Sequence, residues 1–281
     1  MIPIRYVEPV FRPPSEAESL ILPVTDGCSW NECTFCEMYT APQKKFRARD
    51  ESEVLESIRL TGERYGDQVR RIFLADGDAT VLPTRRLLAI LEAIRSHLPA
   101  VRRVSSYCLA AAGLSMVYVG AESGDDEVLA AVNKGETFET TREALDKLGA
   151  AGITRSVMIL NGLGGKVHSR QHADNSARLA NATQPEYLAT LVVSFPMGEQ
   201  RFRAGFPEWE PLSQHELFVE TEQLLSALEL KRTVFRSDHA SNYLVLKGTL
   251  GADKARLLAQ VRQAIEAPEQ AHLRPAWARG L

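Results

Sequence analysis

No apolar run in this sequence approaches the roughly 18 residues that a membrane-spanning helix requires. The N-terminal stretch MIPIRYVEPVFRPPSEAES also lacks the apolar core of a secretory signal peptide, so we expect a cytoplasmic protein with no membrane anchor. A surplus of basic residues is missing too, because 33 Lys and Arg against 36 Asp and Glu give a net charge of -3. This balance argues against a large nucleic-acid-binding surface.

Cysteine is scarce, and its distribution is uneven. Three of the four cysteines, Cys28, Cys33 and Cys36, fall within nine residues of one another. So few cysteines do not indicate a disulfide framework, and in a reducing compartment a cluster of this kind more often binds metal. Three thiolates are one ligand short of a closed site, which leaves one metal position open for a small molecule.

Short apolar runs alternate with segments of helical spacing. The runs predict six strands, at residues 20–24, 71–75, 101–109, 116–121, 155–160 and 187–194. Helical patterns cover residues 51–65, 84–98, 124–132, 138–151, 171–181, 213–228 and 252–267. Strands separated by helices predict βα units and a parallel sheet, and six strands predict an α/β fold of the partial (βα)6, TIM-like barrel type.

The domain boundaries follow from this pattern. We expect an irregular lead-in over residues 1–19, a barrel over residues 20–200, and a C-terminal helical extension over residues 201–281 that covers the barrel. One connection is unusual, because only residues 110–115 separate the third and fourth strands, whereas a parallel crossover usually takes a dozen or more. Either these strands are not parallel neighbours or the chain lacks a helix there, and we expect the second.

Residues suited to ligand binding follow three of the predicted strands, at the end where parallel α/β folds bind ligands. Asp76-Gly77-Asp78 follows the second strand, Glu122-Ser123-Gly124 the fourth, and Asn161-Gly162 the fifth. Each has a simpler explanation, namely a turn, a helix N-terminus capped by Ser123, and a loop. Their shared placement after strands, downstream of the cysteine cluster, favours a common site.

This combination resembles the radical S-adenosylmethionine (SAM) superfamily. The usual cysteine spacing there is x3 and then x2, with an aromatic residue before the last cysteine. This chain has Phe35 at that position but x4 in the first gap. The Glu122-Ser123-Gly124 element is similar to one in the branch that contains coproporphyrinogen oxidases and tRNA methylthiotransferases. The resemblance covers residues 20–194.

The resemblance implies that Cys28, Cys33 and Cys36 hold a [4Fe-4S] cluster and that SAM binds the open iron. A donor such as flavodoxin or ferredoxin would reduce the cluster, SAM would be cleaved, and a 5'-deoxyadenosyl radical would abstract hydrogen from the substrate. The implied cofactor-binding residues are Phe35, Asp76, Gly77, Asp78, Ser106, Glu122, Asn161 and Gly162. Among these, a carboxylate of the Asp76-Gly77-Asp78 turn would take the SAM amino group, and Glu122 the ribose or amine. Ser105 or Ser106 would point toward the ribose, and the strand end at Asn161 and Gly162 would bind the adenine.

Three residues are candidates for a catalytic role. His239 and Tyr243 lie in the polar segment FRSDHASNY, which is explained as well by a hydrogen-bonded loop. Cys108, at the end of the third strand, is expected as a small buried hydrophobe, with a metal ligand or a reactive thiol as the alternatives. Lys44 belongs to a basic run after the cysteine cluster that we expect to face solvent, with pairing to a carboxylate as the alternative.

Two other functions stay open at this point. One is a zinc-binding structural protein with Cys108 as the fourth ligand. The other is a catalytically defective radical SAM scaffold, because a missing helix between the third and fourth strands would damage the barrel wall. The sequence does not name the substrate, and the low net charge favours a small molecule or a peptide over a nucleic acid such as tRNA.

Overall fold

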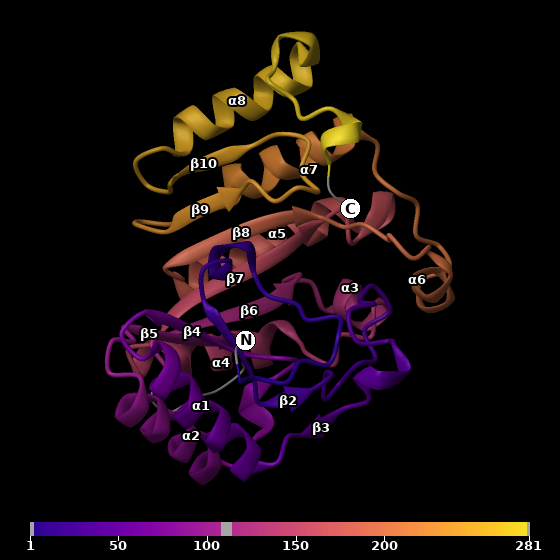
Figure 1. Cartoon of the computed structure of the whole chain (residues 1–281). Helices are drawn as coiled ribbons and strands as arrows, with labels where there is room; N and C mark the ends of the chain where they lie inside the picture. Colours follow the sequence, from indigo (N-terminus) through magenta and orange to yellow (C-terminus); the bar gives the residue numbers. More distant parts are fainter. Residues whose placement is uncertain (1–2, 108–113, 280–281) are drawn as a thin grey trace. The chain divides into compact units, whose positions relative to one another are not determined.

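The computed structural model describes residues 3–107 and 114–279 of the chain (Figure 1). Within these residues, eight strands form one sheet in the order β1-β4-β5-β6-β7-β8-β9-β10. They are β1 (Leu20–Pro23), β4 (Arg71–Ala75), β5 (Arg103–Tyr107), β6 (Met116–Glu122), β7 (Thr154–Asn161), β8 (Tyr187–Val192), β9 (Val234–Ser237) and β10 (Leu246–Thr249). A second small sheet pairs β2 (Thr25–Asp26) with β3 (Arg47–Ala48).

The described residues contain eight α-helices. They are α1 (Glu51–Tyr65), α2 (Thr84–His97), α3 (Asp126–Ala131), α4 (Phe138–Ala150), α5 (Gly165–Thr183), α6 (Gln200–Gly205), α7 (Gln214–Ala227) and α8 (Lys254–Glu266). Short 3-10 helices are η1 (Pro14–Glu16), η2 (Pro42–Lys44), η3 (Ala79–Val81), η4 (Pro268–Gln270) and η5 (Ala276–Ala278). None of the helices in this described part combines the length and apolarity that crossing a membrane requires.

The strand pairing decides between the two explanations of the unusual connection. Ser105 of β5 pairs with Met116 of β6, and Tyr107 pairs with Tyr118, so these strands are parallel neighbours. Residues 108–115 join them, and the crossover is shortened as expected; residues 108–113 lie outside the described residues.

Contacts between Cα atoms divide the chain into two compact units. Unit 1 comprises residues 1–31, 36–119 and 147–154. Unit 2 comprises residues 32–35, 120–146 and 155–281. Each unit contains strands followed by helices.

In unit 1, the parallel strands carry aromatic side chains on one face. Phe73 of β4 lies edge-on to Tyr107 of β5 and Tyr118 of β6, with ring centroids 5.1 and 6.2 Å away. The alternate side chains of β4, Ile72 and Leu74, are fully buried and point to the opposite face. Helices α1 and α2 lie side by side next to β4 and β5 in Figure 1. The strands of unit 1 are therefore covered on both faces, as parallel strands usually are.

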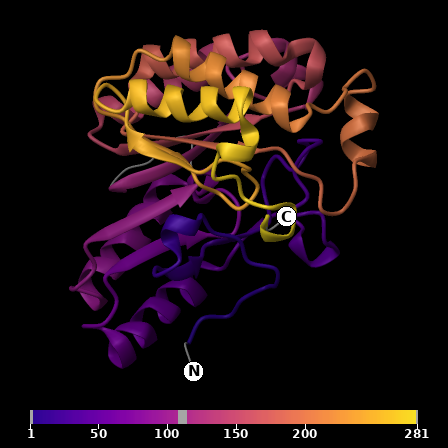
Figure 2. The ribbon, with the colours of Figure 1, turned by 90° about the horizontal axis from the view of Figure 1, so that it is seen from above.

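Unit 2 continues the sheet beyond the predicted barrel. Helix α7 connects β8 to β9, and β9 pairs in parallel with β8, so β9 is a seventh parallel strand. Strand β10 then pairs antiparallel with β9. The segment between the last two predicted helices of the C-terminal extension, which the sequence leaves extended or irregular, thus contains two strands. Figure 2 shows α5, α7 and α8 side by side on one face of these strands.

Helix α6 is also missing from the sequence prediction, yet it contributes to the core of unit 2. Its Phe202 is buried together with Phe206 and Trp209, against Val128 and Leu163. A helix of six residues is too short to show a helical period in the sequence. The sequence pattern therefore does not predict the aromatic cluster around α6.

Candidate functional site

The cysteine loop lies between β2 and β3. Cys28 and Cys36 belong to unit 1 and Cys33 to unit 2, and all three are half-buried. Across residues 3–107 and 114–279, no three His, Cys, Asp or Glu side chains are grouped as ligands of one metal ion. Zinc ligands converge on one point, whereas thiolates on separate irons of a cubane stand farther apart. Three thiols on one loop are the donor set that the sequence predicts for a metal centre.

Two glycines bring the cysteine loop against the turn that follows β4. Gly77 has φ +99°, and a Cβ atom on it would lie 1.9 Å from the Gly27 carbonyl oxygen and 3.2 Å from Cys28 Cα. Gly27 has φ +75°, and a Cβ atom there would lie 2.0 Å from the Lys44 carbonyl oxygen. Both positions require glycine. The predicted Asp76-Gly77-Asp78 turn is therefore in direct contact with the backbone at Cys28.

Asp76 is buried in this turn and has an unusual backbone conformation. Its φ of +77° is rare for a residue other than glycine, and its side chain has no exposed surface. The Thr25 hydroxyl donates to its carbonyl oxygen (2.6 Å), and Lys44 Nζ donates to its Oδ2 (2.5 Å). Its Oδ1 has no hydrogen-bond partner among the described residues. Burial raises the pKa of Asp76, and the Lys44 ammonium opposes that shift.

Two residues that the sequence did not assign to the site hold this turn. Lys44, expected to face solvent, is instead fully buried at the end of η2, and its ammonium forms the alternative pair, with the Asp76 carboxylate. Tyr39 is also buried, and its hydroxyl oxygen accepts the Gly77 N–H (3.0 Å). Burial raises the Tyr39 pKa well above its usual value, so the hydroxyl keeps its proton. A buried carboxylate requires a partner. If Asp76 is buried, a cation must therefore lie nearby, but the sequence does not identify that cation. Asp78 is half-buried at the end of the turn.

The second predicted turn follows β6 and lies in unit 2. Glu122 has φ +64° and is buried, with its Oε1 3.6 Å from Lys134 Nζ. A Cβ atom on Gly120 would lie 2.1 Å from that Oε1, so the carboxylate folds back along its own strand. Burial raises the pKa of Glu122, and Lys134 partly offsets the shift. A buried carboxylate therefore lies at the end of β6, one residue inside the strand where the sequence predicts it just after.

Ser123 is held by α5 and does not cap α3. Its Oγ lies 2.8 Å from His172 Nδ1 and accepts the Asp125 N–H (3.0 Å). The N-cap of α3 is Asp125, whose Oδ1 accepts the Val128 N–H (3.0 Å). The simpler explanation of the Glu-Ser-Gly element as a helix capped by Ser123 is therefore wrong, because the cap comes two residues later.

The third predicted turn, after β7, is anchored to α7. The Asn161 side-chain amide donates to Thr221 Oγ1 (3.1 Å), and the Gly162 N–H donates to Glu220 Oε1 (2.6 Å). Trp209 Nε1 donates to the Gly162 carbonyl oxygen (3.2 Å). Both backbone groups of Gly162 thus have protein partners, and the turn fixes the position of α7 at the end of β7.

Residues 22–180, more than half of the chain, match the family model of the Radical SAM superfamily. The chain belongs to this superfamily. The matched range contains the cysteine loop and the turns after β4, β6 and β7, and it makes the protein an enzyme of the radical SAM class. None of the curated proteins matches the chain.

Solved structures of radical SAM enzymes share the fold. Coproporphyrinogen III oxidase (HemN) from Escherichia coli aligns with a TM-score of 0.54 and 14% identity, over 74% of this chain and 52% of that chain. Methylornithine synthase (PylB) aligns with a TM-score of 0.54 and 14% identity, over 92% of this chain and 74% of that chain. At these identities the likeness shows the fold, a mostly parallel α/β sheet of the partial TIM-barrel type.

The methyltransferase TsrM from Kitasatospora setae also aligns, and its structure holds cobalamin and a [4Fe-4S] cluster. The TM-score is 0.51 and the identity is 19%, over 61% of this chain and 36% of that chain. This chain therefore spans little more than a third of the length of TsrM and about half of the length of HemN.

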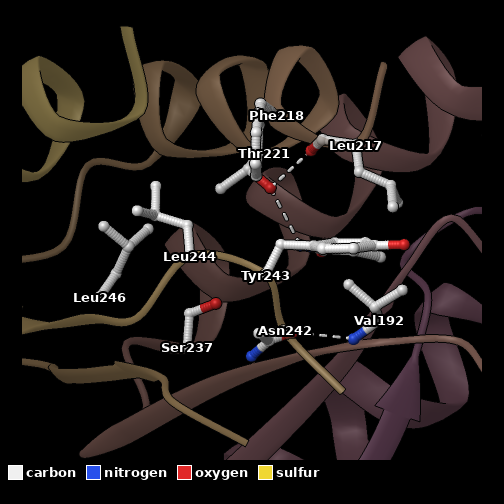
Figure 3. A pocket seen from close by; sticks show the side chains of 10 residues that line it. Val192, Leu217, Phe218, Thr221, Ser237, Asn242, Tyr243, Leu244 and Leu246 are labelled. Atoms are coloured by element: carbon white, nitrogen blue, oxygen red, sulfur yellow. Dashed lines mark hydrogen bonds between the residues drawn. The ribbon is translucent and has the colours of Figure 1, made fainter. Parts of the chain in front are cut away.

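In this radical SAM protein, Tyr243 lines a small pocket of unit 2 together with Asn161 and Thr221 (Figure 3). Asn242 lines it as well, and its Oδ1 accepts the Val192 N–H (2.9 Å), a bond drawn in Figure 3. The Asn242 amide also donates to the carbonyl oxygen of a β8 residue. Asn242 therefore continues the pairing of β8 where β9 has ended. The structure thus brings two predicted residues, Tyr243 and Asn161, to one pocket.

The polar segment that contains His239 and Tyr243 is bound by arginines of unit 2. Arg274 donates to the Asn242 carbonyl oxygen (3.0 Å), and the Arg279 guanidinium lies 3.6 Å from the centroid of the Tyr243 ring. His239 Nδ1 accepts the N–H of the residue two positions later (3.1 Å), and burial lowers its pKa. His239 does not line the pocket of Figure 3. The contacts are those of a hydrogen-bonded loop, and a catalytic role for either residue stays a prediction.

The other predicted cofactor residues make structural contacts. Phe35 packs against the apolar cluster of unit 2 that α6 contributes to. The Ser106 hydroxyl is buried and within hydrogen-bond reach of the carbonyl oxygens of Leu74 (3.0 Å) and Tyr107 (2.7 Å). Strand alternation places Ser106 on the face opposite to the Tyr107 ring, and its hydroxyl oxygen keeps acceptor capacity while it donates to a carbonyl. Cys108 lies outside the described residues.

We expect Glu122→Gln to flatten the pH dependence of stability of the cofactor-free protein. Burial raises the Glu122 pKa in the folded state, so the folded protein binds this proton more tightly than the unfolded chain, where the pKa is about 4.3. The free energy of unfolding of the wild type should therefore fall as the pH rises from that value through the raised pKa. Urea unfolding at a series of pH values measures this slope.

Glu139→Gln is the matched control. The Glu139 carboxylate is exposed, and its pKa is lowered by hydrogen bonding to Arg142. The Glu139 carboxylate stabilises the fold only when it is ionised, so its contribution is lost as the pH falls. Removing it should change the pH dependence of the free energy of unfolding only slightly, and in the direction opposite to Glu122→Gln. A Glu122→Gln profile that parallels the wild type would contradict the raised Glu122 pKa.

Proposed function

We propose that Cys28, Cys33 and Cys36 hold a [4Fe-4S] cluster and that SAM binds beside it, in a cytoplasmic enzyme that acts on a small molecule or a peptide. Family membership and the donor set support this, because three thiols on one loop leave one iron of a cubane for an outside ligand. The solved structures of TsrM hold a [4Fe-4S] cluster and a SAM analogue. When bound, these cofactors supply an electron and a 5'-deoxyadenosyl radical that abstracts hydrogen from the substrate.

The contact between Gly77 and the backbone at Cys28 supports this assignment most directly. Because of it, the Asp76 carboxylate lies in the turn that touches the cysteine loop, and Asp76 Oδ1 is buried without a partner among the described residues. A cationic donor is the partner that a buried carboxylate favours. Asp76 would therefore bind the amino group of SAM.

Further residues would orient the rest of SAM. Glu122, held in a strained conformation at the end of β6, would accept from the ribose or the amine. Asn161 would face the adenine, with the neighbouring Gly162 keeping the strand end in place through its bonds to Glu220 and Trp209. Four cysteines in the whole chain are too few for a second cluster, so an external donor such as flavodoxin or ferredoxin would supply the electron.

Anaerobic reconstitution with iron and sulfide tests the proposal. We expect about four irons per chain and the release of 5'-deoxyadenosine when the reduced protein is mixed with SAM. Bound zinc without uptake of iron would overturn the proposal in favour of the zinc-binding alternative. Iron uptake and SAM binding without any 5'-deoxyadenosine would identify the defective scaffold instead.

A further inference from the structure

Lys44 and Asp76 form an ion pair that is buried completely within unit 1. Lys44 Nζ lies 2.5 Å from Asp76 Oδ2, and neither side chain has exposed surface. Removing two charges from water is costly, and apolar side chains of similar volume are often at least as stable in such a position. Stability alone therefore does not account for a buried lysine and aspartate at this point in the chain.

The two oxygens of the Asp76 carboxylate are in different situations. Oδ2 accepts from Lys44, whereas Oδ1 is buried and has no hydrogen-bond partner among the described residues. A buried acceptor without a donor is costly and rare in folded proteins. The lysine thus fixes the carboxylate in an orientation that leaves one oxygen for a donor that the described residues do not supply.

Lys44 also connects the two segments that meet at this point. Its carbonyl oxygen packs against Gly27, next to the cysteine loop, while its ammonium holds the turn after β4. The Lys44 N–H donates to the Ala41 carbonyl oxygen (2.8 Å) in η2, which fixes its backbone. The Tyr39 hydroxyl accepts the Gly77 N–H of the same turn. The orientation of Asp76 is therefore set by residues that follow the cysteine cluster.

We propose that Lys44 is a positioning residue: it holds the Asp76 carboxylate so that Oδ1 receives the α-amino group of SAM. This inference rests on the proposed function, because it takes SAM as the ligand. Two ammonium groups share the carboxylate, one on each oxygen, and Lys44 does not itself contact the ligand. The matched apolar variant is Lys44→Met, which keeps the length of the side chain and removes its charge and its donors.

The experiment compares two ligands on the anaerobically reconstituted protein by titration calorimetry. SAM carries the amino acid group, and 5'-methylthioadenosine lacks it but keeps the adenosine and the sulfur. A hydrogen bond to a charged group is worth enough for roughly a tenfold loss or more. We therefore expect Lys44→Met to lower the affinity for SAM by that factor and to change the affinity for 5'-methylthioadenosine by less than about twofold.

A double-mutant cycle tests whether Lys44 acts through Asp76. In an Asp76→Asn background, Lys44→Met should cause no further loss of SAM affinity. Lys44→Gln keeps an N–H donor for Oδ2, so it should retain more SAM affinity than Lys44→Met. If Lys44→Met does not fold, Lys44→Gln carries the comparison of the two ligands, and its loss of affinity should again be confined to SAM.

A lower melting temperature with an unchanged ratio of the two affinities would mean that Lys44 only stabilises the fold, and this result would overturn the inference. Equal weakening of both ligands would overturn it as well. In both cases the wild type would still take up iron and bind SAM, so the proposed function would stand. A wild type that takes up no iron would instead overturn the proposed function itself.

Discussion

Replacing Cys36 with alanine should abolish cluster binding. We expect the anaerobically reconstituted Cys36→Ala protein to retain almost no iron, whereas the wild type should retain about four irons per chain. The physical reason is that three thiolates are the minimum set on this loop, and a cubane held by two of them is labile. Iron analysis and the visible charge-transfer absorption of the reconstituted protein measure the loss. Cys36 is half-buried, so the melting temperature of the cofactor-free variant should change little.

Cys108→Ala is the matched control for this prediction. It removes the one cysteine of the chain that lies outside the cluster, and the variant should take up iron like the wild type. Loss of metal in Cys108→Ala would show that Cys108 is a ligand and would revive the zinc alternative. An intact cluster in Cys36→Ala would refute the ligand assignment on the loop.

The elements that the sequence predicts well carry their own local signals. Helix α1 has the predicted bounds because its apolar spacing coincides with a cap, Asp50, whose carboxylate accepts the Ser52 and Glu53 N–H groups. Strand β9 lacks such a signal, because it has four residues and two of them are polar. It exists because α7 returns the chain alongside β8. A strand that forms through pairing with a neighbouring strand need not show an alternation of polar and apolar residues in the sequence.

The candidate site also contains residues that the sequence predicts and residues that it does not. The turns at Asp76 and Glu122 are predictable, because carboxylates and glycines that follow parallel strands collect at one end of a sheet. For Lys44 the sequence suggests a carboxylate partner without identifying it, and for Tyr39 it gives no signal. Each joins the site through one long-range contact with the turn after β4. The face of the sheet on which Ser106 lies could not be predicted for another reason. Near a strand end, a shift of one residue in the strand register moves a side chain to the other face.

Gly77→Ala should disrupt the site severely. The new Cβ atom would lie 1.9 Å from the Gly27 carbonyl oxygen, and the backbone has φ +99°, a conformation that alanine rarely adopts. Two main-chain segments would have to separate, because no flexible side chain is there to yield. We expect a loss of about 3 kcal/mol or more in the free energy of unfolding, measured by urea unfolding, together with impaired uptake of iron.

Gly152→Ala separates the two causes of this loss. Gly152 also has a positive φ, +72°, but a Cβ atom there would meet nothing within 4 Å. This variant should lose about 1 kcal/mol from backbone strain alone and should take up iron like the wild type. The difference between the variants then measures the contact between the Gly27–Cys28 backbone and the turn after β4. If both lost the same free energy and Gly77→Ala still bound a full cluster, that turn would not be part of the cofactor site.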